Sequence, residues 1–347
     1  MRIRNRLLLV GLLLVIVSMG VVWAVVRPRD PIFHGKPETL WIEQLAYNDT
    51  EQVKQWREFG PDGVGVLVRA LEGASRPADR FYRSAVRRMS QVLPGGVLGL
   101  LPAPREDATR ITRMKVVDLL SSLRKDVHAA VPAMAQALKD EDDSVQALAI
   151  TFFTSTEDED ALLNQLPALQ KRKLLPEFIR ALGSVSHWGL RNNAALALKY
   201  FPDEPEVVLS ALTNALNDPM PQVRIVAAGS LHRVAPDAAA ADRVVSVVIG
   251  ILRNSDDQIA HRAAELLGKI GKASALTVPA LIESVQGTNR LVASAAASAL
   301  GSFPDQAEKI VPVLLHAYQN TNGVVSRRMS GRALKKLAPE AAVSLGL

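Results

Sequence analysis

The chain has 347 residues, no cysteine and only 5% aromatic residues, which excludes disulfide bonds, thiolate metal sites and a cysteine nucleophile. Its formal net charge is +6, but five arginines and one aspartate fall within the first thirty residues, which leaves 36 basic and 34 acidic residues in 31–347. Because nucleic-acid-binding surfaces are strongly basic, this near-neutral balance argues against a nucleic-acid partner.

The N-terminus consists of a basic tail at residues 1–6 and an apolar segment at residues 7–26 that contains no charged residue. At about 1.5 Å per residue, a helix of this length spans about 30 Å, the thickness of a bilayer core. We therefore predict a transmembrane anchor at 7–26. Cleavable signal peptides have a shorter apolar run of about 7–15 residues, so cleavage near Ala24, which would give a secreted protein, is the second interpretation.

Arginines flank this segment on both sides, and they set its predicted orientation. Three precede it and two follow it: Arg2, Arg4, Arg6, Arg27 and Arg29. The more basic flank stays on the cytoplasmic side, and here that is the N-terminal flank. We therefore expect the domain that follows to lie on the extracytoplasmic, periplasmic side of a bacterial membrane. Residues 27–37 would be the linker to it. The alternative is the inverted topology, with the domain in the cytoplasm.

The remainder of the chain, residues 38–347, carries a repeated pattern typical of paired helices. An aliphatic residue is followed four and five positions later by two alanines and eight positions later by leucine, in windows that start at Leu190, Val223, Ile259 and Val292. These positions share one helix face, and the small alanines allow a neighbouring helix to approach closely. The alanine pairs are Ala194-Ala195, Ala227-Ala228, Ala263-Ala264 and Ala296-Ala297.

A second helix is expected after each of these first helices. Pro-Asp or Pro-Glu marks the turn between them, at Pro61-Asp62, Pro202-Asp203, Pro236-Asp237, Pro304-Asp305 and Pro339-Glu340. We expect Pro132, Pro279 and Pro312 in the first turn of second helices, where a missing N–H is tolerated. Polar breaks should supply the N-caps of the next first helices, at Asp142-Asp143-Ser144, Asp256-Asp257 and Thr288-Asn289.

Looser copies extend the pattern in both directions. They start at Phe81, Ile111, Val145 and Val325, and the interval from Val145 to Leu190 is 45 residues, about eleven more than its neighbours. We place this insertion around residues 156–173. With a further pair near 51–73, the sequence predicts about nine helix pairs between residues 49 and 347, and a helix at 38–47 that covers the first of them.

These units resemble HEAT repeats, antiparallel helix pairs that stack into an α-solenoid. The matching motifs are VRIVAAGSL at 223–231, LLGKI at 266–270 and VPAL at 278–281. The resemblance implies an all-α fold, a right-handed superhelix of about nine HEAT-like pairs preceded by one N-terminal transmembrane helix. The apolar segment followed by FHGKPETLWIEQL at 33–45 is similar to membrane-anchored or exported bacterial HEAT-repeat proteins.

The resemblance implies a scaffold for protein–protein interaction, because stacked helix pairs present a long, preformed surface. We expect no catalytic, cofactor-binding or metal-binding residues, and no small-molecule substrate. The protein partner would contact polar positions of the second helices outside the repeated pattern. The candidates are Glu283, Gln286, His316 and Gln319.

The alternative is an enzyme on the same solenoid, similar to the HEAT-type bilin lyases or metal-dependent hydroxylases. The hydroxylases use His-Glu pairs as metal ligands, and none of the six histidines here is followed by glutamate. His232 and His261 lie on helices of adjacent pairs and could approach one another. Since no carboxylate accompanies them at ligand spacing, we interpret both as ordinary helix-surface or groove residues.

The last complete helix of the pattern is strongly basic. Its cations are Arg327, Arg328, Arg332, Lys335 and Lys336. Terminal repeats need a polar outer surface for solubility, so the first interpretation of this cluster is a solubilising end cap. The second interpretation is a site for an acidic partner.

Overall fold

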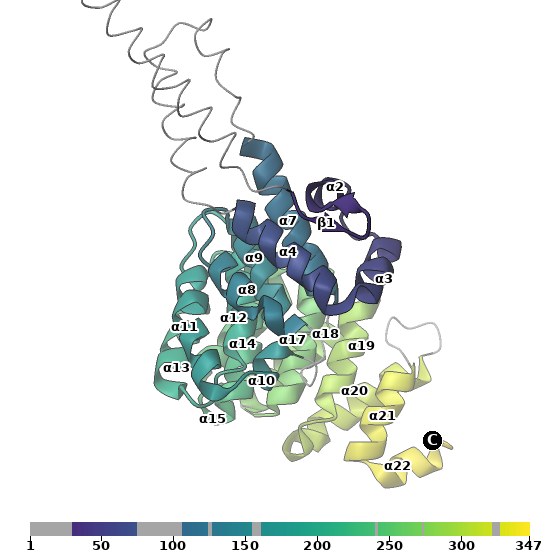
Figure 1. Cartoon of the computed structure of the whole chain (residues 1–347). Helices are drawn as coiled ribbons and strands as arrows, with labels where there is room; N and C mark the ends of the chain where they lie inside the picture. The colour runs from purple at the N-terminus through teal and green to yellow at the C-terminus, as the bar shows by residue number, and fades with distance from the viewer. Residues whose placement is uncertain are drawn as a thin grey trace, which may run out of the picture. The chain divides into compact units, whose positions relative to one another are not determined.

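The computed structural model describes residues 30–74, 106–123, 127–154, 161–239, 242–272, 274–320 and 327–347. The chain divides into two compact units, Met1–Val116 and Val117–Leu347 (Figure 1). The expected basic tail 1–6, the anchor 7–26 and the first helix starting at Phe81 lie outside the described residues. Within the described ranges, no helix is both long and apolar enough to cross a membrane.

The first unit opens with a small β-hairpin where a linker was expected. Strands β1 (Ile32–Phe33) and β2 (Lys36–Pro37) pair antiparallel. The turn between them has positive φ at His34 and Gly35, 44° and 77°, as tight two-residue hairpins require. The Trp41 indole N–H donates to the Phe33 carbonyl at 2.8 Å, so the hairpin is held by a residue of the helix that follows it.

Three helices follow the hairpin: α2 (Glu38–Glu43), α3 (Thr50–Glu58) and α4 (Gly60–Ala74). The helix expected at 38–47 therefore ends four residues early. Arg69 of α4 donates to both carboxylate oxygens of the buried Glu38 on α2, which joins the first and last of these helices. Helix α7 (Glu106–Leu123) contains the boundary between the two units.

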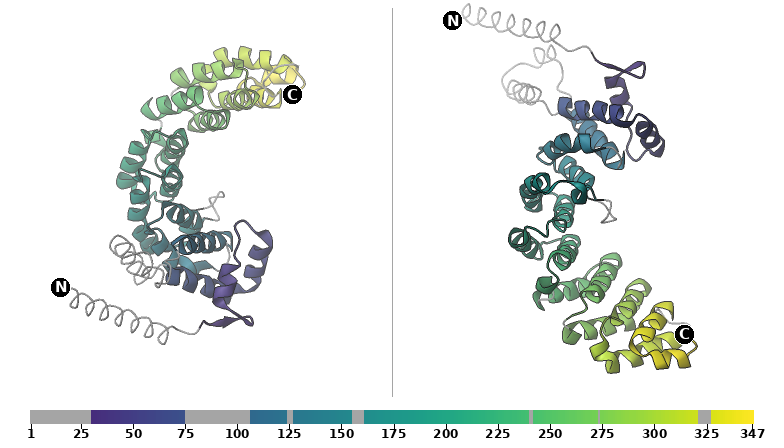
Figure 2. Two further views of the ribbon diagram at one scale, coloured as in Figure 1. Left: turned by 90° about the horizontal axis from the view of Figure 1, so that it is seen from above. Right: turned by 60° about the horizontal axis from the view of Figure 1, so that its bottom comes forward.

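The second unit is a series of antiparallel helix pairs (Figures 1 and 2). After the last residues of α7 it continues with the 3₁₀ helix η1 (Val127–Ala130) and α8 (Val131–Ala137). The first helices are α9 (Asp143–Phe153), α12 (Trp188–Leu198), α14 (Pro221–Val234), α17 (Asp257–Ile270), α19 (Arg290–Leu300) and α21 (Arg327–Leu337). The second helices are α11 (Ala168–Leu182), α13 (Pro205–Ala215), α16 (Asp242–Asn254), α18 (Ser274–Gln286), α20 (Ala307–Gln319) and α22 (Pro339–Ser344).

Each first helix packs against the first helices of its neighbouring pairs, in the order α9, α12, α14, α17, α19, α21. All eight alanines of the four predicted pairs are fully buried at 0% exposure. The leucines that follow them, Leu198, Leu231, Leu267 and Leu300, are at most 1% exposed. The alanine-lined seams thus join the pairs into one continuous interior, and the predicted helical repeat is confirmed for these pairs.

Glycine allows the closest approach between two first helices. A methyl group added at Gly268 of α17 would lie 2.8 Å from the Cβ of Ala299, and one at Gly301 would lie 3.2 Å from the Cβ of Ala333. The second helices of successive pairs contact one another less extensively than the first helices do. The first helices therefore form the tighter row of the stack.

The caps of the first helices agree with the sequence pattern. Asp142, Asp256 and Asn289 each accept a hydrogen bond from a backbone N–H in the first turn of α9, α17 and α19. Of the three prolines expected in first turns, Pro132 lies at the start of α8. Pro279 and Pro312 instead lie inside α18 and α20.

Those two helices begin five residues before the proline, at Ser274 and Ala307. The extra turn buries apolar side chains, since Val278 is 1% and Ile310 0% exposed. We attribute the early start to this burial, which outweighs the one backbone hydrogen bond that a proline removes.

The Pro-Asp and Pro-Glu markers fall at turns, as expected. Pro236 starts the short helix α15 (Pro236–Ala239), Pro304 the 3₁₀ helix η3 (Pro304–Gln306) and Pro339 the helix α22. The insertion after α9 contains a short helix, α10 (Leu162–Gln165), whose Leu162 and Leu163 are buried. The α10 segment of the insertion is therefore packed against the unit.

Candidate functional site

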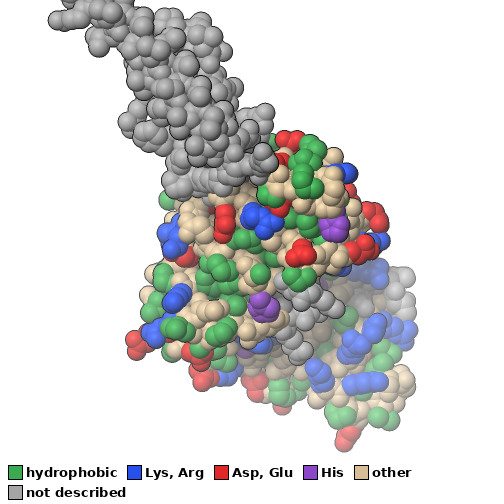
Figure 3. All heavy atoms as spheres, in the orientation of Figure 1, with side chains coloured by type: hydrophobic (Ala, Val, Ile, Leu, Met, Phe, Trp, Pro, Cys, Tyr) green, Lys and Arg blue, Asp and Glu red, His purple; other side chains and the backbone are tan. Residues whose placement is uncertain are grey.

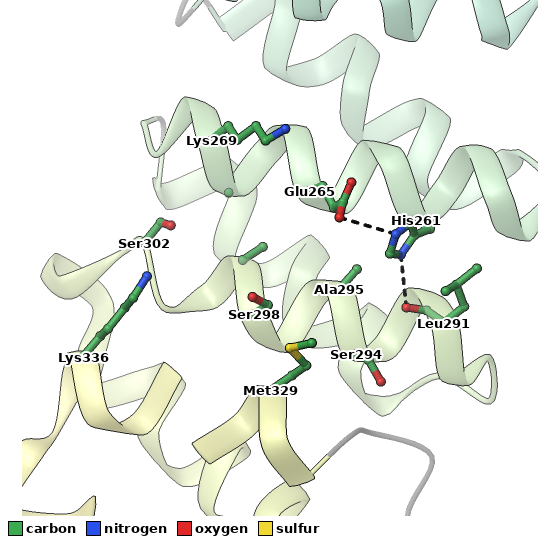
Figure 4. A pocket seen from close by; sticks show the side chains of 12 residues that line it. His261, Glu265, Lys269, Leu291, Ser294, Ala295, Ser298, Ser302, Met329 and Lys336 are labelled. Atoms are coloured by element: carbon green, nitrogen blue, oxygen red, sulfur yellow. Dashed lines mark hydrogen bonds and ion pairs between the residues drawn. The ribbon is translucent and has the colours of Figure 1, made fainter. Parts of the chain in front are cut away.

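The first helices α17, α19 and α21 enclose a pocket of about 400 Å³ (Figure 4). Its wall on α17 is formed by His261, Glu265, Gly268 and Lys269, and its wall on α21 by Met329 and Lys336. Its floor is formed by α19 and the residues that follow it: Leu291, Ser294, Ala295, Ser298, Ala299 and Ser302. We call this feature the first-helix groove.

The groove exists because the side chains of α19 are small. Ser294 and Ser298 are four residues apart on α19, so they lie on one side of the helix, and Ser302 follows just after the helix ends. Ala295 and Ala299 lie beside them and are 6% and 5% exposed. Longer side chains on α17 and α21 rise on either side of this low floor, which leaves a hollow lined with hydroxyl groups.

One wall of the groove contains a histidine–carboxylate pair. His261 Nε2 lies 3.4 Å from Glu265 Oε1, one turn further along α17. The other ring nitrogen, Nδ1, lies 3.4 Å from the Leu291 carbonyl oxygen on α19 (Figure 4). Both neighbours are acceptors, so a neutral ring can donate to only one of them at a time.

The pair was missed in the sequence because only the residue directly after each histidine was compared with a ligand motif. Glu265 follows His261 by four positions, a spacing that brings two side chains together on a helix. That spacing was the signal that could have found it. Within the described ranges, no group of three or more His, Cys, Asp or Glu residues is arranged to hold a metal ion.

His232 lies on α14 in a different environment from His261, and no interaction between the two is seen. Its Nδ1 is buried without a hydrogen-bond partner among the described residues. Burial lowers the pKa of His232, and the positive charges of Lys269 and Lys272 lower it further. His232 is therefore a neutral packing residue at neutral pH.

The four residues expected to contact a partner are all exposed on second helices, Glu283 and Gln286 on α18 and His316 and Gln319 on the adjacent α20. Glu283 accepts two hydrogen bonds from Arg253 of α16, at 3.0 and 2.7 Å. The groove lies on the other row of helices. Partner contact at these four residues stays a prediction.

Helix α21 presents all five of its cations to solvent: Arg327, Arg328, Arg332, Lys335 and Lys336. The Arg327 guanidinium lies 4.6 Å from the centre of the Tyr318 ring. Among the described residues, none of the five forms an ion pair with a carboxylate. Figure 3 shows blue side chains gathered over the C-terminal helices, at the lower right.

Comparison with protein families supports the repeat assignment. The family described as HEAT repeat matches residues 208–238, which include most of α13 and all of α14. No curated protein matches the chain. Among solved structures, the chain is similar to an engineered protein from a structural genomics consortium, with 20% identity, a TM-score of 0.43 and coverage of 60% of this chain and 96% of that one. It is also similar to a designed armadillo repeat protein, with 16% identity, a TM-score of 0.45 and coverage of 60% and 99%.

The fold of the second unit is thus that of an all-α repeat protein, built from helix pairs that share one interior. Residues 208–238 match the HEAT repeat family, and the first helices α12, α17 and α19 on either side carry the same buried alanine pair as α14. The family match therefore covers one segment of the chain, residues 208–238, within a stack of helix pairs.

Proposed function

We propose that this protein is a membrane-tethered scaffold that binds a protein partner in the first-helix groove and carries out no catalysis. The observation behind this proposal is a preformed hollow that runs across three successive helix pairs. Its floor and walls belong to packed helices, so a partner that binds there does not have to order them. Hydroxyl groups on the floor can form hydrogen bonds with a peptide backbone.

The groove is favoured over the second-helix surface because it combines shape with chemistry. Glu283, on the second-helix surface, is already bound to Arg253, whereas Ser298 and Ser302 line an open pocket. A bulky substitution at the floor separates the two surfaces. We expect Ser298→Trp to abolish co-purification of the native partner and Gln286→Trp to leave it unchanged. The opposite result would move the binding surface to the second helices.

The tether is the apolar segment 7–26, and its length and its flanking arginines support this role. We expect the full chain to stay in the membrane fraction after alkaline carbonate extraction, and a variant without residues 7–26 to be released. A phosphatase fused to the C-terminus should be active if the solenoid is periplasmic. A fusion active only as a cytoplasmic reporter would instead establish the inverted topology.

The proposal of a non-catalytic scaffold is tested by metal analysis of the purified full chain. The alternative, a lyase-like or hydroxylase-like enzyme on the same solenoid, has its nearest support in the His261–Glu265 pair. Stoichiometric iron or zinc that is lost in His261→Gln would favour the enzyme. Metal content at background in both proteins would favour the scaffold.

A further inference from the structure

We propose that the first-helix groove takes an extended acidic segment of a partner protein, with carboxylates at alternate positions. This inference rests on the proposed function, because it names the partner chemistry of the same groove. It starts from the charge on α21, whose exposed cations have no carboxylate partners among the described residues.

The charge of α21 is more than an end cap needs. A polar cap can be built from side chains of both signs, but every charged residue of α21 is a cation. Arg328, Arg332 and Lys336 follow one another at one-turn intervals, where like charges repel. A bound anion would relieve this repulsion, so the helix is suited to an acidic ligand.

The cation row runs beside the groove: Lys336 lines the pocket, whereas Arg328 and Arg332 lie on the same side of α21 outside the lining. Met329 and Lys336 both line the pocket, and Arg332 lies between them, one turn before Lys336. Figure 4 places Lys336, Ser302 and Lys269 around the same end of the pocket. The Lys336 ammonium group lies near the Ser302 hydroxyl, whereas the Lys269 ammonium group points away from both. The end of the pocket formed by Lys336 and Ser302 fits a carboxylate.

The spacing of the cations selects an extended peptide. Residues four apart on a helix rise by about 6 Å, and alternate residues of an extended chain lie about 6.6 Å apart on one side. Three acidic side chains at alternate positions therefore match Arg328, Arg332 and Lys336 one to one. The peptide backbone would then run along α19, within reach of the serine hydroxyls.

A peptide fits these features better than a nucleic acid or a lipid surface. The pocket is recessed between helices, and its lining includes the carboxylate of Glu265 and the apolar Met329 and Leu291. A nucleic-acid duplex or a flat anionic bilayer would fail to reach the floor of this recessed pocket. The near-neutral charge of residues 31–347 also lacks the broad basic surface that nucleic acid requires.

The test uses two acetylated fluorescent hexapeptides and the full chain in detergent micelles. One peptide alternates Glu and Ala, and the other has three Glu followed by three Ala. We expect the alternating peptide to bind more tightly, and its affinity to fall as salt rises. The double variant Arg332→Glu with Lys336→Glu should bind it at least tenfold more weakly, whereas Arg332→Lys should retain binding.

Lys173→Glu, a charge reversal at an exposed residue of α11, is the matched control and should bind like wild type. Circular dichroism confirms that each variant is folded. Equal affinity for both peptides, or unchanged affinity in the double variant, would overturn the inference. A third outcome would also overturn it: the wild type binds anionic vesicles or duplex DNA but neither peptide, and the double variant loses that binding.

The variant Ser298→Trp separates this inference from the proposed function. If it loses the native partner while the double charge reversal retains it, the groove is the binding site and the acidic specificity is wrong. If both variants retain the native partner, the groove itself is not the site and both proposals fail. Loss in both supports both.

Discussion

Arg191 and Asp218 form a buried ion pair that joins α12 to the turn before α14. The guanidinium donates to the carboxylate at 2.6 and 3.0 Å, and the two side chains are 10% and 8% exposed. Arg191 also donates to the Ser184 carbonyl, and Asp218 accepts from the Met220 N–H. Burial alone would raise the pKa of Asp218, but the hydrogen bonds from Arg191 and Met220 hold that pKa below its usual value.

Removal of one partner of this pair leaves a buried charge without compensation. We predict that Asp218→Ala lowers the free energy of unfolding by about 3 kcal/mol, measured by urea denaturation. Glu283→Ala is the control, because its pair with Arg253 is 49% and 63% exposed and such pairs contribute less than about 1 kcal/mol. Similar losses in the two variants would contradict the role given to the buried pair.

His232 makes stability depend on pH in a defined direction. An unshifted histidine has a pKa of about 6.5, and burial, Lys269 and Lys272 lower the pKa of His232 in the folded state. Below that unshifted value the unfolded chain takes up a proton that the folded chain does not, so stability falls as the pH falls. Above it, both states hold the neutral ring and the effect vanishes.

We predict that His232→Gln makes the unfolding free energy fall less between pH 7 and pH 5 than it does in wild type. His316→Gln, at an exposed position on α20, should follow the wild-type curve. Asp143 and Asp218 also have lowered pKa values, but aspartates titrate near pH 4 or below. Parallel curves for wild type and His232→Gln would show that the ring is free to take up a proton.

At the scale of elements, the seam between α17 and α19 depends on the absence of a side chain at Gly268. Replacing glycine by alanine inside a helix usually stabilises it by about 0.5–1 kcal/mol. At Gly268 the new methyl group would meet Ala299 Cβ at 2.8 Å, whereas nothing lies within 4 Å of one at Gly250. The same substitution should therefore have opposite effects at the two positions.

We predict a lower midpoint of thermal unfolding for Gly268→Ala and an unchanged or higher midpoint for Gly250→Ala, both measured by circular dichroism. A gain in stability at Gly268 would mean that α17 and α19 are not held in close contact.

The first helices could be predicted from sequence because alanine pairs and capping residues are local signals. Windows placed at Leu190, Val223, Ile259 and Val292 fall within two residues of the starts of α12, α14, α17 and α19. The starts of α18 and α20 could not be placed, because they depend on the burial of Val278 and Ile310 against other helices. The hairpin at Ile32–Pro37 was missed for a similar reason, since it depends on a contact with Trp41.

The groove was beyond sequence reasoning, although its parts were visible there. The serines of α19, the histidine and glutamate of α17 and the cations of α21 belong to three different repeats. Only the stacking of these repeats brings Ser298, Glu265 and Lys336 around one pocket. Positions outside a repeated pattern differ between repeats, so the pattern itself does not indicate which row of helices will be hollow.

At the scale of the whole molecule, the second unit is a stack of helix pairs whose tight row of first helices contains the candidate site. The proposed anchor at 7–26 would hold this solenoid at a membrane, where a tethered scaffold meets its partners at raised local concentration. Tethering and binding are separate properties in this proposal. A variant without residues 7–26 should therefore lose membrane association while it keeps its affinity for a partner in solution.

Site-specific photocrosslinking in native membranes tests most directly which surface of the solenoid binds a partner. A photoreactive amino acid would replace Ser298 on the groove floor in one protein and Gln286 on α18 in another. We predict a discrete crosslinked product from position 298 that disappears when the groove is filled by an excess of the alternating acidic peptide, and none from position 286. A product from position 286 alone would contradict binding in the first-helix groove.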